Sequence, residues 1–199
     1  MLSSKQLTPP TGQAWQTPAA GAKKLSAEQM YNGETLFHGP LLQGLREAAS
    51  ISSDALLARC VEVSLDAAQA GQFASRSVID GFAADVMMQA ALVWVRQTHG
   101  YACLPSGFAA MEWYRPLPAG GEYFLSLRIT SSSPTTVIAT CTMHDQAGTA
   151  YMVGRDLTLI INKTLKYQSG AAPQAATNGV SGFAAQPKGS KLTAEIDYQ

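Results

Sequence analysis

The stretch that decides the fold is Asp80-Gly-Phe-Ala-Ala-Asp-Val-Met-Met-Gln-Ala-Ala-Leu-Val-Trp-Val95. Nearly every residue after Gly81 is apolar, and a helix that is apolar on all sides lies inside a protein. The run is too short and too interrupted to span a bilayer. It therefore predicts a buried central helix around which the rest of the chain is organised.

Two polar residues interrupt this helix, Asp85 and Gln89, and their spacing of four places both on one helical face. A carboxylate is rarely buried without partners, because desolvation penalises its charged form. Asp80 can cap the start of the helix, so Asp85 is not needed there. Two interpretations stay open. Either Asp85 interacts favourably with the helix dipole, or it is a functional carboxyl group with an amide one helical turn later.

Composition limits the function classes. The chain has 199 residues, with 14 basic and 14 acidic side chains that cancel, and this size suits one domain. The basic residues form no long cluster, so we expect neither nucleic acid nor a membrane as a partner. The three cysteines are widely spaced and the N-terminus shows no secretory signal, which predicts no metal site and a reduced, cytoplasmic setting. Charged residues make up only 14% of the chain, which hints at a surface that a partner covers.

Both ends of the chain have linker composition. Residues 1–27 are rich in Pro, Gly, Ala, Gln and Thr without a sustained apolar period, and residues 167–199 repeat this pattern. We therefore expect an N-terminal linker over residues 1–27, one domain over residues 28–166, and a flexible C-terminal linker over residues 167–199.

Strand-like runs flank the helix on both sides. Leu36–Leu45 predicts a strand that Gly39-Pro40 interrupts, so that an edge, a bend or a loop is expected there, and residues 55–65 predict a second strand. Four runs with turn residues between them follow the helix: Ser106–Arg115, Glu122–Ser131, Thr136–His144 and Thr149–Leu165. The predicted fold class is α+β, a single hotdog in which an antiparallel sheet curls around one long helix.

Several short motifs, in this order along the chain, resemble those of polyketide-synthase-type dehydratase domains. The segment Tyr31-Asn-Gly-Glu-Thr-Leu-Phe-His-Gly-Pro-Leu-Leu-Gln-Gly44 resembles the entry to the second hotdog of that family, and Asp85-Val-Met-Met-Gln89 fits its D-x-x-x-Q motif. Leu104-Pro-Ser-Gly-Phe108 and His144-Asp-Gln-Ala-Gly148 are similar to two later motifs. The resemblance covers residues 28–165, and its F-H-G-P variant indicates the dehydratase regions of polyunsaturated fatty acid synthases and related iterative polyketide synthases.

The resemblance implies a chemistry. In this family two hotdogs lie side by side and remove water from a β-hydroxyacyl chain carried on the phosphopantetheine of acyl carrier protein, without a cofactor of their own. By position, Asp85 would be the acid that protonates the departing hydroxyl, and Gln89 would help to hold it. An apolar tunnel around Asp85 would raise its pKa and the helix N-terminus would lower it, and the sequence leaves the balance open. The implied substrate-binding residues are His38, Gly39, Pro40 and Pro105.

The histidines depart from the family pattern. A histidine in an H-x-x-x-G-x-x-x-x-P motif on the first hotdog takes the α-proton, and none of the three histidines here begins that motif. His99 is predicted to be a surface residue matched to the helix dipole, and His144 a turn residue. His38, in the predicted strand, is either a residue of the F-H-G-P bend or a catalytic one.

Three functions therefore stay open. The chain is the second hotdog of a dehydratase whose histidine comes from a partner hotdog, or a dehydratase-like half kept for scaffolding or acyl-chain binding, or a thioesterase-type hotdog. The expected partners are acyl carrier protein and either a sister hotdog or a second copy of this chain, because an open sheet edge invites pairing.

Overall fold

The computed structural model describes residues 8–12, 14–15, 18, 21–62 and 81–165. Within these residues eight strands form one antiparallel sheet in the order β1-β2-β3-β6-β7-β8-β4, and β5 also pairs with β8. The strands are β1 (Lys23–Ser26), β2 (Leu45–Ile51), β3 (Ala55–Val61), β4 (Ala102–Gly107), β5 (Ala110–Trp113), β6 (Glu122–Ser132), β7 (Thr136–His144) and β8 (Ala150–Asn162). The helical elements are α1 (Ala27–Met30), the 3₁₀ turn η1 (Pro40–Leu42) and the long α3 (Gly81–His99).

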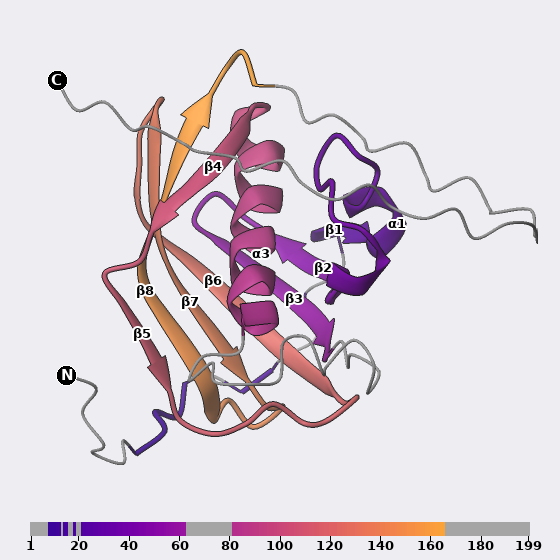
Figure 1. Cartoon of the computed structure of the whole chain (residues 1–199), viewed down its shortest axis with the longest axis vertical. Coiled ribbons are helices and arrows are strands. Elements are labelled where there is room, and N and C mark those ends of the chain that lie inside the picture. The colour runs from indigo at the N-terminus through magenta and orange to yellow at the C-terminus, as the bar shows by residue number, and fades with distance from the viewer. Residues whose placement is uncertain (1–7, 13, 16–17, 19–20, 63–80, 166–199) are drawn as a thin grey trace, which may run out of the picture.

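The helix α3 packs against one face of the sheet, with β6, β7 and β8 behind it and β1, β2 and β3 beside it (Figure 1). Its residues are buried continuously from Gln89 to Val95, within the stretch that the sequence predicts to be buried. The indole nitrogen of Trp94 donates a hydrogen bond to the Ser52 carbonyl at 2.9 Å, so even its polar atom is paired. Gly100, with a φ of +73°, ends the helix in a conformation that favours glycine. The α+β class and the central helix are therefore confirmed.

The strands after the helix match the sequence pattern with one exception. The bounds of β7 are those expected, and β6 and β8 differ from expectation by at most three residues at an end. The single strand expected over Ser106–Arg115 is wrong, because two short strands, β4 and β5, pair with β8 there instead. The register of β4 shifts between Pro105 and Gly107. Proline and glycine both weaken a strand interior, which explains the division.

Of the interrupted strand expected over Leu36–Leu45, the break at Gly39-Pro40 is confirmed and the strand before Leu45 is wrong. Pro40 opens the 3₁₀ turn η1, and β2 begins only at Leu45. A proline at the first helical position loses no backbone hydrogen bond, and Gly39 before it serves as the N-cap. His38 consequently lies in a loop and not in a strand.

The sheet also reaches into the range expected to be an N-terminal linker. Residues of β1 pair with β2, and Thr11 forms an isolated antiparallel bridge with Thr149. The structured part therefore begins before the expected boundary at residue 28. The C-terminal linker expected over residues 167–199 lies outside the described residues.

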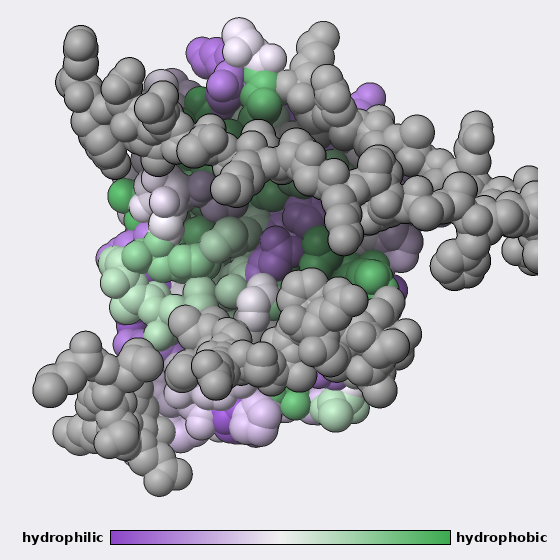
Figure 2. All heavy atoms as spheres, in the orientation of Figure 1, coloured by the Kyte–Doolittle hydropathy of each residue, from purple (hydrophilic) through white to green (hydrophobic). Residues whose placement is uncertain are grey.

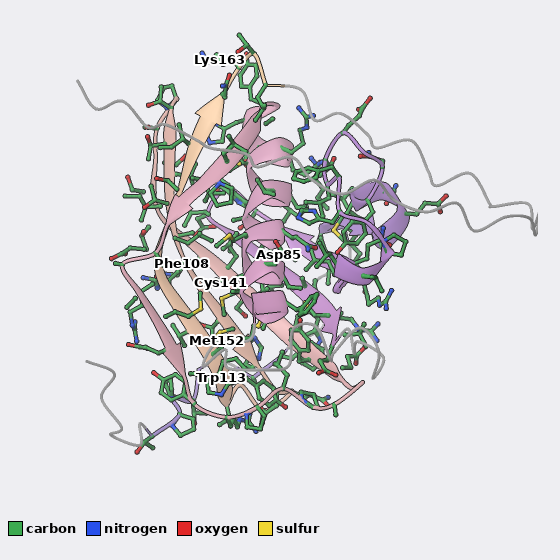
Figure 3. The ribbon with its side chains drawn as sticks, in the orientation of Figure 1. Asp85, Phe108, Trp113, Cys141, Met152 and Lys163 are labelled. Carbon is green, nitrogen blue, oxygen red and sulfur yellow. The ribbon has the colours of Figure 1, made fainter. Side chains whose placement is uncertain are left out.

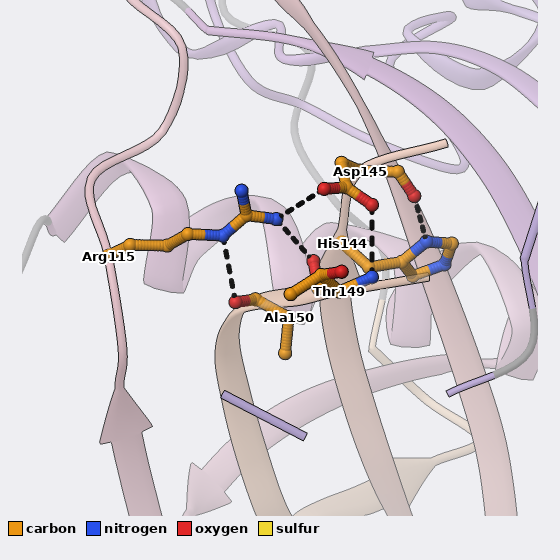
Figure 4. Close-up of polar contacts among 5 residues, drawn as sticks. All are labelled: Arg115, His144, Asp145, Thr149 and Ala150. Carbon is orange, nitrogen blue, oxygen red and sulfur yellow. Dashed lines mark hydrogen bonds and ion pairs between the residues drawn. The ribbon is translucent and has the colours of Figure 1, made fainter. Parts of the chain in front are cut away.

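A charged cluster joins the segment after β5 to the hairpin between β7 and β8 (Figure 4). One guanidinium nitrogen of Arg115 donates to the Asp145 carboxylate at 2.7 Å and to the Thr149 carbonyl at 2.6 Å, and Nε donates to the Ala150 carbonyl at 3.2 Å. The second carboxylate oxygen of Asp145 accepts from the Thr149 backbone N–H at 2.9 Å. The guanidinium also lies 3.9 Å from the centre of the Tyr151 ring. Both oxygens of this carboxylate are thus paired.

The described ranges contain neither a membrane span nor a metal-binding cluster. No helix there is long and apolar enough to cross a membrane. No cluster of three or more His, Cys, Asp or Glu side chains in the same ranges could hold a metal ion. Cys60, Cys103 and Cys141 are buried and free, and burial raises the pKa of each thiol, that of Cys103 to about 12.

Candidate active site

Asp85 lies in the second turn of α3, on a side of the helix that the sheet leaves partly open. Figure 3 labels it near the middle of the molecule, and Figure 2 shows a hydrophilic area at this place, between hydrophobic ones. The Asp85 side chain is 31% exposed, whereas Gln89, one turn later, is fully buried. Their spacing of four does bring them together, because the Gln89 amide nitrogen donates to Oδ2 of Asp85 at 2.7 Å.

The Gln89 amide is held from three sides. Besides Asp85, its nitrogen donates to the Leu42 carbonyl at 2.7 Å, and its oxygen accepts from the Tyr31 hydroxyl at 2.6 Å. The Tyr31 oxygen in turn accepts from the Leu45 backbone N–H at 2.9 Å. A carbonyl can only accept, so one orientation of the amide satisfies all of these bonds. Oδ2 of Asp85 therefore has a fixed partner, and Oδ1 is the oxygen left for other work.

The charge of Asp85 follows from these contacts. Burial by itself raises the pKa of its carboxyl group, but the contact with His38 and the hydrogen bond from Gln89 outweigh that effect, and the pKa lies below its usual value. Asp85 is therefore a carboxylate at neutral pH. The sequence left open whether the pKa of Asp85 is raised or lowered, and in the structure it is lowered. Burial also raises the pKa of the Tyr31 phenol, so this hydroxyl keeps its proton for Gln89.

His38 approaches Asp85 from the loop before η1. Its Nε2 lies 3.6 Å from Oδ1 of Asp85, and its side chain is only 8% exposed. The ring stacks on that of Phe37, with centroids 4.6 Å apart and 19° between the planes. Its other nitrogen, Nδ1, is buried and has no hydrogen-bond partner, and it is the one buried side-chain nitrogen or oxygen of the described residues in this state.

The expected substrate-binding residues are brought together only in part. His38 contacts Asp85, and Gly39 and Pro40 follow it directly and are exposed. Pro105 lies in β4, paired with β8, and no hydrogen bond or ion pair of the described residues joins β4 to Asp85. The contact of these residues with a substrate stays a prediction.

Sequence reasoning gave no role to Tyr31 or to the Leu42 carbonyl. They are 58 and 47 residues from Gln89 in the chain, so no periodicity connects them to the helix. The available signal was the resemblance itself, because the matching motif begins at Tyr31 and contains Leu42.

The two other histidines lie elsewhere. His144 is not the turn residue expected, because it is the last residue of β7 and is 3% exposed. Its Nε2 lies 2.8 Å from the Ser126 hydroxyl and its Nδ1 lies 2.8 Å from the Asp145 carbonyl. His99, in the last turn of α3, lies 3.0 Å from the Ser132 hydroxyl at an exposed position.

A pocket lies beside the first turns of α3. Its lining is mostly apolar and comprises Leu42, Val61, Glu62, Phe82, Ala83, Val86, Leu117 and Tyr123. Asp85 is not one of the lining residues, so its expected place in an apolar tunnel stays a prediction.

An antiparallel sheet on a long helix, with a carboxylate and an amide one turn apart on that helix, defines a hotdog domain of the dehydratase type. Residues 8–161 match the family model of the polyketide synthase dehydratase N-terminal domain, and the chain belongs to this family. Because the matched model is described as N-terminal, the placement of the chain as a second hotdog stays a prediction.

One known relative is part of a polyunsaturated fatty acid synthase. The chain is similar to a component of the polyunsaturated fatty acid synthase of Thraustochytrium sp., with 37% identity over 129 residues. The matched part is 64% of this chain and 5% of that protein. The chain thus spans about a twentieth of the relative's length.

Solved structures show the same fold. A trans-AT polyketide synthase dehydratase domain from Brevibacillus brevis superposes with a TM-score of 0.57 and 16% identity, over 78% of this chain and 55% of that one. The dehydratase domain of RzxB from Pseudomonas fluorescens gives 0.54 and 16%, over 74% and 53%. The dehydratase domain from the CurH module of the curacin polyketide synthase gives 0.54 and 18%, over 80% and 56%. This chain therefore has the hotdog fold and corresponds to little more than half of each solved domain.

Proposed function

We propose that this chain supplies the carboxyl group of a dehydratase, which removes water from a β-hydroxyacyl chain held as a thioester on the phosphopantetheine of acyl carrier protein. The observation that carries the proposal is the Gln89 amide, fully buried and paired on three sides, which fixes Oδ2 of Asp85. A carboxyl group fixed through Oδ2, with Oδ1 facing His38, can take part in proton transfer to a leaving group either directly or through the neighbouring imidazole.

The chemistry needs such a group. Hydroxide is a poor leaving group, so it must receive a proton as its bond to carbon breaks, and a positioned acid typically accelerates this step about 10² to 10⁴-fold. Because Oδ2 accepts a hydrogen bond from Gln89, the acidic proton has to be handled on the side of Oδ1. The elimination breaks a C–H and a C–O bond and forms a C=C bond without an external oxidant or reductant, so we propose no cofactor beyond the phosphopantetheine of the carrier.

The proton on the α-carbon needs a base. The resemblance implies that this base is an imidazole on a sister hotdog, and the proposal is supported by the chain spanning 53 to 56% of the solved dehydratase domains to which it is similar. We therefore propose that the working unit contains this chain and a second hotdog, which is either a sister domain or another copy of the chain. Light scattering of the isolated 21.1 kDa chain distinguishes these arrangements, because a second copy doubles the mass. A monomer at tens of micromolar contradicts pairing with a second copy.

The deciding experiment replaces Asp85 by Asn in the chain assembled with its sister hotdog. We expect turnover of a β-hydroxyacyl pantetheine thioester, followed by enoyl absorbance, to fall about 10² to 10⁴-fold, because an amide can neither carry the proton nor stabilise a charged proton donor beside it. The matched control is Asp145→Asn, the same substitution in the paired cluster of Figure 4, which should leave the turnover of folded protein unchanged. Full turnover in Asp85→Asn removes Asp85 from the mechanism.

One observation favours a second function. The lowered pKa of Asp85 makes it a carboxylate at neutral pH, and a half that only serves as a scaffold needs no protonated carboxyl group. The two functions separate in the same assay. If the unmodified assembly binds the pantetheine thioester but produces no enoyl product, the chain is a scaffold or an acyl-chain-binding half.

A further inference from the structure

The feature that the proposed function leaves unexplained is Nδ1 of His38. The His38 side chain is 8% exposed, and this nitrogen is buried without any hydrogen-bond partner. A buried polar atom without a partner destabilises the fold, because it has lost its hydrogen bonds to water. The Gln89 amide, by contrast, is fully paired, so the unpaired nitrogen stands out as the place where another molecule would bind.

The position of the ring decides what that nitrogen can bind. Nε2 faces Oδ1 of Asp85, and because a carboxylate only accepts, Nε2 carries a hydrogen. Nδ1 is then an acceptor when the ring is neutral and a donor when it is charged. A hydroxyl group can pair with either form, since it both donates and accepts. Stacking on Phe37 and a hydrogen bond from Gln43 to the His38 carbonyl, at 3.1 Å, hold the residue in place.

We propose that His38 is the residue that touches the β-hydroxyl of the substrate, so that the departing oxygen takes its proton from Nδ1 while Asp85 holds the imidazole through Nε2. This inference rests on the proposed function and moves the point of proton delivery from the carboxyl group to the imidazole beside it.

The step balances. The bond from the β-carbon to oxygen breaks, and the oxygen leaves as water with the proton from Nδ1. The electron pair of the α-carbon–hydrogen bond becomes the new double bond, and the α-proton passes to the imidazole base of the sister hotdog. Both imidazoles then exchange protons with water. In this arrangement Asp85 stays ionised and stabilises the charged ring, in the way that a carboxylate orients a catalytic histidine.

The ionised state of Asp85 agrees with His38, and not Asp85, being the group that delivers the proton. The Asp85 carboxyl group is ionised at neutral pH, so it is a poor store for the proton, whereas imidazole is the side chain that most often serves as a general acid or base. Phe37 and Leu41, the apolar residues on either side of the loop, are 48% and 50% exposed. They give an acyl chain an apolar surface next to the nitrogen.

The first test observes the nitrogen directly. The chain contains three histidines, so ¹⁵N-histidine labelling gives a spectrum in which His99 and His144 serve as internal controls. The probes are the amide analogue of a 3-hydroxyacyl pantetheine thioester and the same analogue without the hydroxyl. We expect the hydroxyl analogue to shift the Nδ1 resonance of His38 alone, and the analogue without the hydroxyl to bind without that shift.

The outcomes separate the two proposals. If calorimetry shows that the hydroxyl analogue binds and Nδ1 of His38 does not respond, the assignment of His38 is wrong and the proposed function survives. If neither analogue binds, the proposed function fails, and the assignment of His38 fails with it.

The second test measures turnover in the chain assembled with its sister hotdog. Glutamine can hold a hydroxyl but cannot pass on a proton, so His38→Gln should lower kcat about 10² to 10⁴-fold and leave KM nearly unchanged. The matched control is His99→Gln, which alters an exposed histidine on Ser132 and should leave both constants unchanged. A kcat of His38→Gln within twofold of the unmodified assembly overturns the proposal.

Discussion

The two buried histidines of this chain differ in what their ring nitrogens contact. His144, at the end of β7, has the Ser126 hydroxyl on one nitrogen and the Asp145 carbonyl on the other. His38, in the loop before η1, faces Asp85 with one nitrogen and has no partner for the other. Their side chains are similarly inaccessible, so burial alone does not separate a structural histidine from a reactive one.

The carboxylates that accompany the two histidines also differ in how completely their oxygens are paired. Asp145 has both oxygens paired, one with Arg115 and one with the Thr149 N–H. Asp85 has Oδ2 paired tightly with Gln89 and Oδ1 only loosely with His38, at 3.6 Å. A cluster that satisfies its own hydrogen bonds can stabilise the fold and do nothing else. A cluster that leaves one buried atom without a hydrogen bond makes the fold less stable. A ligand that pairs with this atom restores the lost stability.

The largest effect that we expect on stability comes from the paired side of the Asp85 cluster. Gln89→Leu leaves the Leu42 carbonyl and the Tyr31 hydroxyl buried without their partner. We expect the free energy of unfolding to fall by about 2–4 kcal/mol, measured by urea denaturation.

The control for this prediction is Gln97→Leu, the same substitution on α3 at a partly exposed position without a described hydrogen bond. We expect it to change the unfolding free energy by less than about 0.5 kcal/mol. Equal effects in the two variants would show that the Gln89 hydrogen bonds add no net stability.

A smaller effect should follow when His144 is made to resemble His38. Ser126→Ala removes the hydroxyl partner of its Nε2 and leaves that nitrogen buried and unpaired. We expect a loss of about 1–2 kcal/mol in unfolding free energy with unchanged turnover. Ser132→Ala, which removes the partner of the exposed His99, should cost almost nothing and is the matched control. A change in turnover in Ser126→Ala contradicts the division between a structural and a reactive histidine.

The smallest effect is a dependence of stability on acid. Burial raises the pKa of Asp145, but the hydrogen bonds from Arg115 and Thr149 outweigh it, so its pKa, like that of Asp85, is lowered in the folded chain. A lowered folded-state pKa contributes stability above the unfolded value of about 3.9, and this contribution is lost as the pH falls through the folded value. Unfolding free energy should therefore drop below about pH 5, and less steeply in Asp145→Asn and in Asp85→Asn. Parallel curves for the three proteins would rule out both contributions.

The parts of the fold with a regular period could be predicted from the sequence. In the apolar run of α3 and in the alternating residues of β6 and β7, a few consecutive residues suffice to indicate which faces are buried. The residues around Gly39-Pro40 were expected to form an interrupted strand, because the same dipeptide is compatible with a strand edge and with the start of a helical turn. The position of β1 was missed because a strand of four residues in a polar segment has too little pattern to detect.

The candidate site divides in the same way. The contact between Asp85 and Gln89 could be predicted, because a helix fixes the distance between positions four apart. The contact of Asp85 with His38 could not, because it depends on where a loop 47 residues earlier crosses the helix. The direction of the Asp85 pKa shift could not be predicted either, since it is the difference between burial and hydrogen bonds from separate segments.

The bond between Tyr31 and Gln89 also determines how short a functional fragment of this chain can be. A fragment that starts at residue 32 keeps α3 with Asp85 and Gln89, but it lacks the phenol that holds the Gln89 oxygen and receives the Leu45 N–H. A fragment that starts at residue 28 keeps the phenol but lacks β1, the strand that pairs with β2. Domains exchanged between synthases would therefore need a junction upstream of Lys23 to carry an unaltered carboxyl group with them.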